Sequence, residues 1–195
     1  MYQLLSKEVG MQQLYDVFFA SSNKNKYLEA KAILSRFEIT LGFFKCTLKE
    51  MQSNVLKEVA YHKVLDAFDQ CLKPVIVEDD GLFIKSLRGF PGPYSSFVFK
   101  TIGNEGILRL LNTQRVARFY SVIAYCDKKK KTSLFEAYIT GKISKKPNGK
   151  KWGFDPIFIP DGSKKTFAQI VNKNFISHRY LALKKFANWF VHKRQ

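Results

Sequence analysis

Pro74-Val-Ile-Val-Glu-Asp-Asp-Gly-Leu82 is the stretch that decides the fold of this chain. Its apolar run, residues 75–77, is typical of a buried strand of the parallel-sheet type. Three carboxylates, Glu78, Asp79 and Asp80, follow directly. Because α/β sheets bind ligands beyond the carboxyl ends of such strands, and Mg²⁺ prefers oxygen ligands, a metal site where this strand ends is one interpretation of the stretch. For these residues alone, an acidic turn without a ligand is favoured, and the metal site depends on the other polar clusters of the chain.

The length and composition of the chain are those of an ordinary globular protein. It has 195 residues, of which 46% are hydrophobic. We expect residues 15–195 to form a single domain and residues 1–14 to be an extension whose order the sequence does not decide. No apolar run reaches the roughly 18 residues of a membrane span, and no signal peptide is recognisable, so a cytoplasmic protein is expected.

The chain is strongly basic. It has 33 Lys and Arg residues against 16 Asp and Glu residues, for a formal net charge of +17. This charge favours an anionic partner, such as a nucleotide, a nucleic acid or an acidic lipid, without choosing among them. Residues 128–151 contain nine lysines and a single acid, Glu136. The first four lysines, Lys128–Lys131, separate two strand-like runs, and we expect them to form an exposed hairpin turn outside any active site.

The spacing of apolar residues predicts alternating strands and helices. Strands or extended segments are expected at residues 16–20, 38–48, 75–77, 81–88, 115–126, 133–143 and 157–159. Helices are expected after Asn23, over residues 55–72 and 104–111, and after Ser177, which can cap the last helix. This order predicts an α/β fold.

Polar clusters, rather than common nucleotide motifs, mark the candidate site. The chain contains no P-loop, G-x-G-x-x-G, H-E-x-x-H or G-x-S-x-G pattern. The turn at residues 21–26 leads from the first strand into a helix, and the free N–H groups of a helix start favour an anion. Lys173, His178 and Arg179 gather cations at the start of the last helix, where the helix dipole disfavours them. We therefore expect these three side chains to meet a ligand.

In their order along the chain, these clusters resemble the motifs of the inosine triphosphate pyrophosphatase family. The matching segments are Ser21-Ser-Asn-Lys-Asn-Lys26, Leu48-Lys-Glu-Met-Gln52, Val77-Glu-Asp-Asp-Gly-Leu82, Gly89-Phe-Pro-Gly-Pro-Tyr-Ser95, Trp152-Gly-Phe-Asp-Pro-Ile-Phe158, Lys165-Thr-Phe-Ala168 and Lys173-Asn-Phe-Ile-Ser-His-Arg179. The resemblance covers nearly the whole chain after the extension. It implies hydrolysis of non-standard purine nucleoside triphosphates (ITP, dITP and XTP) to the monophosphate and pyrophosphate. It also implies a long twisted mixed sheet flanked by helices, two lobes with a central active-site cleft, and a homodimer.

The resemblance also implies a role for each matching position. Glu50 and Asp79 would bind Mg²⁺, and Asp79, with Glu78 beside it, would activate the water that attacks the α-phosphorus. Lys173, His178 and Arg179 would read the six-position of the purine. The remaining substrate-binding positions are Ser21, Ser22, Asn23, Lys24, Asn25, Lys26 and Lys63 for the triphosphate, and Trp152, Gly153, Phe154 and Asp155 for the base.

Two positions depart from the family pattern. Trp152 replaces the usual Phe, which preserves an aromatic surface. Asp80, a further substrate-binding position, replaces a Thr or Ser, and a bare carboxylate there would repel a triphosphate. We expect Asp80 to serve the metal, directly or through a metal-bound water. An Asp80 that turns away, or that alters the preferred substrate, is the alternative.

Two other functions stay open at this point. A basic protein with 15% aromatic residues suits a nucleic-acid-binding role, with backbone contacts and base stacking. A related pyrophosphatase for other modified nucleotides, or for dUTP, is the nearest alternative among enzymes. Binding to nucleic acid should fall steeply with salt, whereas a Mg²⁺-dependent hydrolase should still turn over at moderate salt.

Overall fold

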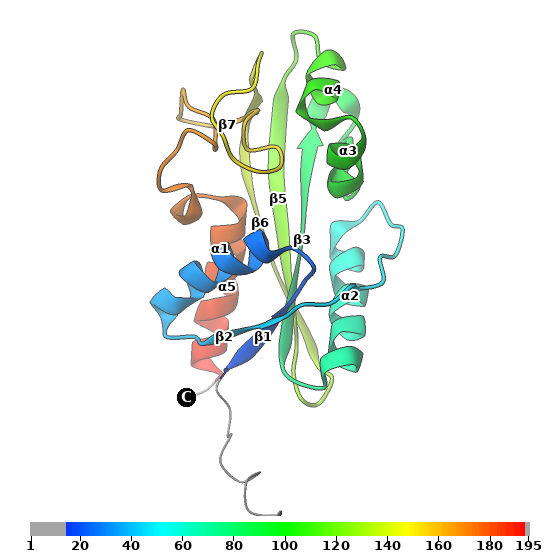
Figure 1. The fold of residues 1–195 in the computed structure, drawn as a ribbon, viewed down its shortest axis with the longest axis vertical. Helices are drawn as coiled ribbons and strands as arrows, with labels where there is room; N and C mark the ends of the chain where they lie inside the picture. Colours follow the sequence, from blue (N-terminus) through cyan, green and yellow to red (C-terminus); the bar gives the residue numbers. More distant parts are fainter. Residues whose placement is uncertain (1–14, 194–195) are drawn as a thin grey trace, which may run out of the picture.

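The protein folds as a mixed sheet with helices on both faces (Figure 1). The structure is a computed structural model that describes residues 15–193. Its strands are β1 (Val17–Ala20), β2 (Leu41–Phe44), β3 (Val75–Ile84), β4 (Pro91–Gly92), β5 (Val116–Cys126), β6 (Thr132–Ile143) and β7 (Phe158–Pro160). Its helices are α1 (Lys24–Leu34), α2 (Leu56–Cys71), α3 (Ser95–Thr101), α4 (Gly103–Arg109) and α5 (His178–His192). The predicted extension, residues 1–14, lies outside the described residues. The α/β prediction is confirmed.

The sheet combines parallel and antiparallel pairs. Its strand order is β2-β1-β3-β5-β6-β7, with β4 paired to β3. The strand β1 runs parallel to both β2 and β3. The strands β3, β5 and β6 form long antiparallel ladders, and the β5–β6 hairpin is the predicted one. The short strand β1 therefore pairs only with the start of β3, which continues well beyond it.

The acidic cluster lies inside β3, so the prediction that the strand ends before it is wrong. The strand continues to Ile84 because β5 pairs with it along its whole length. On the other side of β3, β1 pairs only with Val75 and Ile76, and β4 pairs only with Leu82 and Phe83. The cluster thus occupies the gap between these two short pairings. The carboxyl end that opens onto it is that of β1.

The described residues form two lobes, with two hydrophobic cores in the lower lobe and one in the upper lobe. In the lower lobe of Figure 1, α1 and α5 pack on one face of the sheet through a core that includes Phe19, Ile76 and Phe186. On the other face, α2 packs over a core that includes Val75 and Val77. A separate core, with α3 and α4 beside it, fills the upper lobe. The two lobes agree with the expected fold, and a cleft between them stays a prediction.

The helix predictions hold in most places. The α2 helix begins and ends within one residue of its predicted bounds, and Ser177 caps α5 by accepting a hydrogen bond from the Tyr180 N–H. The α3 helix was not predicted, because a single residue separates it from the Gly/Pro run of residues 89–93. Among residues 15–193, no helix is long and apolar enough to cross a membrane.

Candidate functional site

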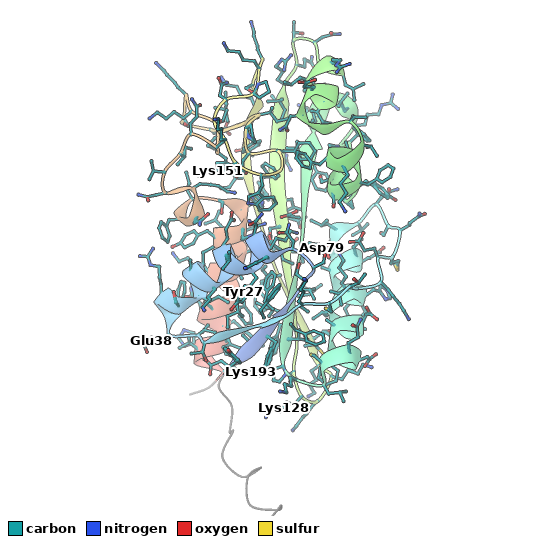
Figure 2. All side chains as sticks on the ribbon, in the orientation of Figure 1. Tyr27, Glu38, Asp79, Lys128, Lys151 and Lys193 are labelled. Atoms are coloured by element: carbon teal, nitrogen blue, oxygen red, sulfur yellow. The ribbon has the colours of Figure 1, made fainter. Side chains whose placement is uncertain are left out.

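The three carboxylates of β3 point alternately to the two faces of the sheet. Successive side chains of a strand alternate, so Asp79 shares a face with Val75 and Val77, beneath α2. Glu78 and Asp80 share the opposite face with Ile76, toward α1 and α5. The side chains of this short acidic run therefore lie in two different environments, one on each face of the sheet. Figure 2 shows Asp79 at mid-height of the molecule, beside the start of α1.

On the α2 face, two carboxylates converge on one cation. The Lys63 ammonium lies 2.7 Å from Asp79 Oδ1 and 3.0 Å from Glu50 Oε1. Burial alone would lower the pKa of Lys63, but the charges of Asp79 and Glu50 outweigh burial and raise it. The second oxygen, Asp79 Oδ2, is buried and accepts no hydrogen bond from a described residue. This side chain thus has an acceptor free for a water or a metal.

The turn between β1 and α1 faces the same cluster. Asn23 caps α1, and its Oδ1 accepts from the N–H groups of Asn25 and Lys26. Ser21 Oγ accepts from the Asn23 N–H. The Lys26 ammonium reaches β3, 3.3 Å from Asp80 Oδ2 and 3.4 Å from the Glu78 carbonyl oxygen. A fixed helix start and a lysine therefore lie next to the acidic strand.

On the α1 and α5 face, Arg179 is held by three carboxylates. Its Nε donates to both carboxylate oxygens of Glu78 at 2.8 Å, and its Nη2 donates to Asp80 at 2.8 Å. Its Nη1 donates to Glu29. Glu78 also accepts from Ser121 Oγ, and its side chain is fully buried. This arrangement orients the guanidinium from three sides.

Asp80 therefore meets cations of the protein, which differs from the expected role at the metal. Strand alternation places its carboxylate on the face opposite Asp79, where Arg179 and Lys26 reach it. Burial alone would raise the pKa of Asp80, but the charges of Lys26 and Arg179 outweigh burial and lower it. The extra negative charge is thus neutralised within the site.

A second buried ion pair lies on the base side. Lys173 Nζ lies 2.6 Å from Asp155 Oδ2, and both side chains are almost fully buried. Trp152 donates its ring N–H to Glu29, and the Arg179 guanidinium lies 5.2 Å from the centre of the Trp152 ring. Glu29 therefore contacts Trp152 and both cations, Lys173 and Arg179. The half-buried Trp152 ring offers the flat surface that a nucleobase would stack on.

His178 is an uncharged ring at neutral pH. It is buried at the start of α5 and stacks on Phe119 with ring centres 4.5 Å apart. Burial lowers its pKa well below the ordinary value of 6.5. Its Nδ1 has no hydrogen-bond partner among the described residues. A neutral imidazole whose Nδ1 is unpaired can read a polar group of a ligand by hydrogen bonding.

Other predicted site residues lie apart from this network. Ser22, Lys24 and Asn25 are exposed, and within residues 15–193 no side-chain bond joins them to the acidic strand. Phe154 is 4% exposed, belongs to the core of the upper lobe and packs edge-on against Phe99, and its part in binding the base stays a prediction. Gly153 accepts a hydrogen bond from the Asn104 side chain through its carbonyl.

Sequence reasoning missed Glu29 and Ser121. Glu29 follows Lys26 by three residues on α1, so helical spacing alone would have placed both on one face. Ser121 pairs with Asp80 in the β3–β5 register. No local pattern points to Ser121, because its partners on β3 are set only by strand pairing.

These features define an α/β protein with a charged site at the carboxyl end of a parallel strand, where acids and cations face each other. The chain belongs to the Ham1 family, whose model matches residues 17–189. The dITP/XTP pyrophosphatase of Methanopyrus kandleri is 46% identical, with 89% of this chain and 95% of that protein covered. The dITP/XTP pyrophosphatase of Thermococcus kodakarensis is 42% identical, with 88% and 95% covered.

The fold agrees with that of a solved relative. A HAM1 protein from Coxiella burnetii has a TM-score of 0.80 and 27% identity to this chain, covering 90% of this chain and 98% of its own. The predicted resemblance is therefore confirmed, together with the predicted α/β architecture.

Proposed function

We propose that this protein is a Mg²⁺-dependent pyrophosphatase that hydrolyses ITP, dITP and XTP to the monophosphate and pyrophosphate. The observation that carries the proposal is the division of β3 into two faces. One face has Asp79 with Glu50 and Lys63, and the other has Glu78 and Asp80 with Lys26 and Arg179. Relatives named dITP/XTP pyrophosphatase support dITP and XTP as substrates.

The residues on the α2 face fit a divalent cation. Glu50 and Asp79 come from different segments yet already share one cation, the Lys63 ammonium. Mg²⁺ is usually held by one or two carboxylates together with substrate phosphates and waters, which suits the pair of Glu50 and Asp79. When bound, Mg²⁺ would neutralise charge on the phosphates.

Asp79 is the group that we assign to the water. Its Oδ2 can accept a proton from a water that attacks the α-phosphorus, as the bond to the bridging oxygen breaks and pyrophosphate leaves. Lys26, the Asn23-capped helix start and Lys63 would bind the triphosphate. Glu78 has both oxygens on Arg179, so we assign it to positioning that guanidinium.

The base would lie on the opposite side of β3. Trp152 would stack on the purine, and His178, Lys173 and Arg179 would bind its six-position oxygen. Donors fixed in a buried site reject the amino group of adenine because they would be left unpaired, at a cost of about 1–3 kcal/mol per group. Asp155 would hold the Lys173 ammonium in place.

The experiment is to incubate the protein with Mg²⁺ and a panel of nucleoside triphosphates, and to identify the products. We expect ITP, dITP and XTP to give monophosphate and pyrophosphate, with ATP and GTP turned over far more slowly. Orthophosphate and a diphosphate as first products would contradict the proposal. The proposal also includes a homodimer, a cytoplasmic location and a single domain over residues 15–195. Light scattering tests the oligomeric state.

A further inference from the structure

A cavity at the open end of the β5–β6 hairpin is separate from the site on β3. Its volume is about 790 Å³, and small-molecule sites span about 300–1,000 Å³. It lies where Val116 pairs with Lys142, the first pair of this ladder. Asp79 pairs with Val122, six residues further along β5, which is roughly 20 Å at about 3.4 Å per residue. None of the site residues described above lines it.

The cavity carries positive charge without an acid. Among the described residues that line it are five cations and no carboxylate, the cations being Lys85, Arg115, Lys142, Lys145 and Lys146. None of these four lysines forms an ion pair with a carboxylate of residues 15–193. In the site on β3, by contrast, each cation faces at least one carboxylate. A concave surface lined by one sign of charge concentrates the potential that attracts the opposite sign.

Arg115 makes one wall of the cavity rigid. Its three guanidinium nitrogens donate to the carbonyl oxygens of Leu111, Asn112 and Ser144, at 2.8–3.1 Å. These bonds join the segment after α4 to the residue after β6 and leave the positive charge of Arg115 without a carboxylate. This wall of the cavity is therefore fixed before a ligand arrives, which lowers the entropy cost of binding against it.

Part of the lining of the cavity is apolar. Val116 and Ile159 both pair with Lys142, so their side chains lie on the same face of the sheet as this lysine, while Ile143, also in the lining, is buried on the opposite face. A small inorganic anion would leave the apolar surface of Val116 and Ile159 unused, whereas a nucleoside polyphosphate has a base for this surface and phosphates for the lysines. We propose that this cavity is a second nucleotide site, which binds a nucleoside polyphosphate without hydrolysing it. This second site would bind a nucleotide without hydrolysing it, because its lining offers no carboxylate for a catalytic metal.

The test is calorimetric titration with ATP in EDTA at about 0.15 M NaCl, where the Debye length of about 8 Å screens diffuse surface attraction. The variant carries Lys142→Gln, Lys145→Gln and Lys146→Gln together. The matched control carries Lys128→Gln, Lys129→Gln and Lys131→Gln, which remove the same charge from the exposed tip at the other end of the hairpin. Losing one charge-assisted bond of ordinary strength weakens binding about tenfold.

We expect the cavity variant to lose at least about tenfold in ATP affinity and the control to keep wild-type affinity. Equal affinity in the cavity variant, or an equal loss in both variants, would overturn the proposal. Hydrolysis of ITP with Mg²⁺ should persist in the cavity variant, which shows that it is folded. The single change Lys145→Gln, which should weaken ATP binding to a smaller degree, decides the matter if the triple variant fails to fold.

Two outcomes distinguish the second nucleotide site from a nucleic-acid-binding surface and from the proposed hydrolysis. A single-stranded oligonucleotide of about 10 nucleotides that binds through the same lysines, while ATP does not, would overturn the small-ligand proposal in favour of nucleic acid. Absence of ITP hydrolysis in the wild-type protein would contradict the proposed function and leave the ATP titration in EDTA unaffected. The two failures are thus distinguishable.

Discussion

Asp80→Asn tests whether the extra carboxylate of β3 serves the cations of the protein. Asparagine has nearly the same shape and keeps one acceptor oxygen, so the change removes mainly the charge. The Asp80 carboxylate lies 2.8 Å from Arg179 Nη2 and 3.3 Å from Lys26 Nζ. Two unit charges 3.3 Å apart attract by about 5 kcal/mol at an effective dielectric constant of 20, before desolvation is subtracted.

The net loss should be smaller than this attraction. Arg179 keeps Glu29 and Glu78 as partners in the variant, so no cation is left without a carboxylate except Lys26. A hydrogen bond to a charged group contributes about 1.5–3 kcal/mol net. We therefore expect Asp80→Asn to lower the free energy of unfolding by about 2 kcal/mol at pH 7.

The pH dependence gives a second signature. The folded protein lowers the pKa of Asp80, because Lys26 and Arg179 outweigh the effect of burial. Such a carboxylate stabilises the fold above its unfolded pKa of about 3.9, and this stabilisation is lost as the pH falls through the folded pKa. The stability difference between wild type and variant should be constant between about pH 5 and pH 8, and should shrink below about pH 4.

Urea denaturation across this pH range is the assay. Glu105→Gln is the matched control, since it removes the same charge from a pair with Arg109 on the surface of α4, where little change is expected. Suppose that Asp80→Asn keeps wild-type stability at pH 7 while the Mg²⁺ concentration needed for ITP hydrolysis rises about tenfold. The carboxylate would then serve the metal, and its assignment to Lys26 and Arg179 would be wrong.

The remaining predictions concern turnover and one titration. Asp79→Asn should lower ITP turnover by at least about 100-fold in a pyrophosphate-release assay, and near-normal turnover at saturating Mg²⁺ would refute its role toward water. Glu50→Gln should mainly raise the Mg²⁺ concentration for half-maximal turnover, so an unchanged Mg²⁺ titration would count against it. Changing Lys128–Lys131 to Ser should preserve turnover, because the tip lies at the lower end of the molecule, away from Asp79 (Figure 2), and loss at every ionic strength would contradict this. NMR titration should find the His178 ring uncharged between about pH 6 and pH 8, because burial lowers its pKa, and protonation near pH 6.5 would disprove its burial.

Elements with a strong apolar period were predictable from the sequence. The α2 helix and the β5–β6 hairpin lie where the spacing of apolar residues placed them. The continuation of β3 through Asp79, Asp80 and Gly81 was not predictable, because these residues have low strand propensity and only pairing with β5 makes them a strand. Local preference gave way there to long-range hydrogen bonding.

The sequence by itself determined the order of the elements, the family and most of the residue types of the site. Which acid meets which cation was decided only by the tertiary structure. Successive side chains of a strand alternate, so Asp79 and Asp80 lie on opposite faces of β3. The α2 helix packs on the face of Asp79, and α1 and α5 pack on the face of Asp80. Arg179 meets Glu78 across 101 residues of sequence. No local pattern encodes such a pair, because its distance depends on how the whole sheet and its helices pack.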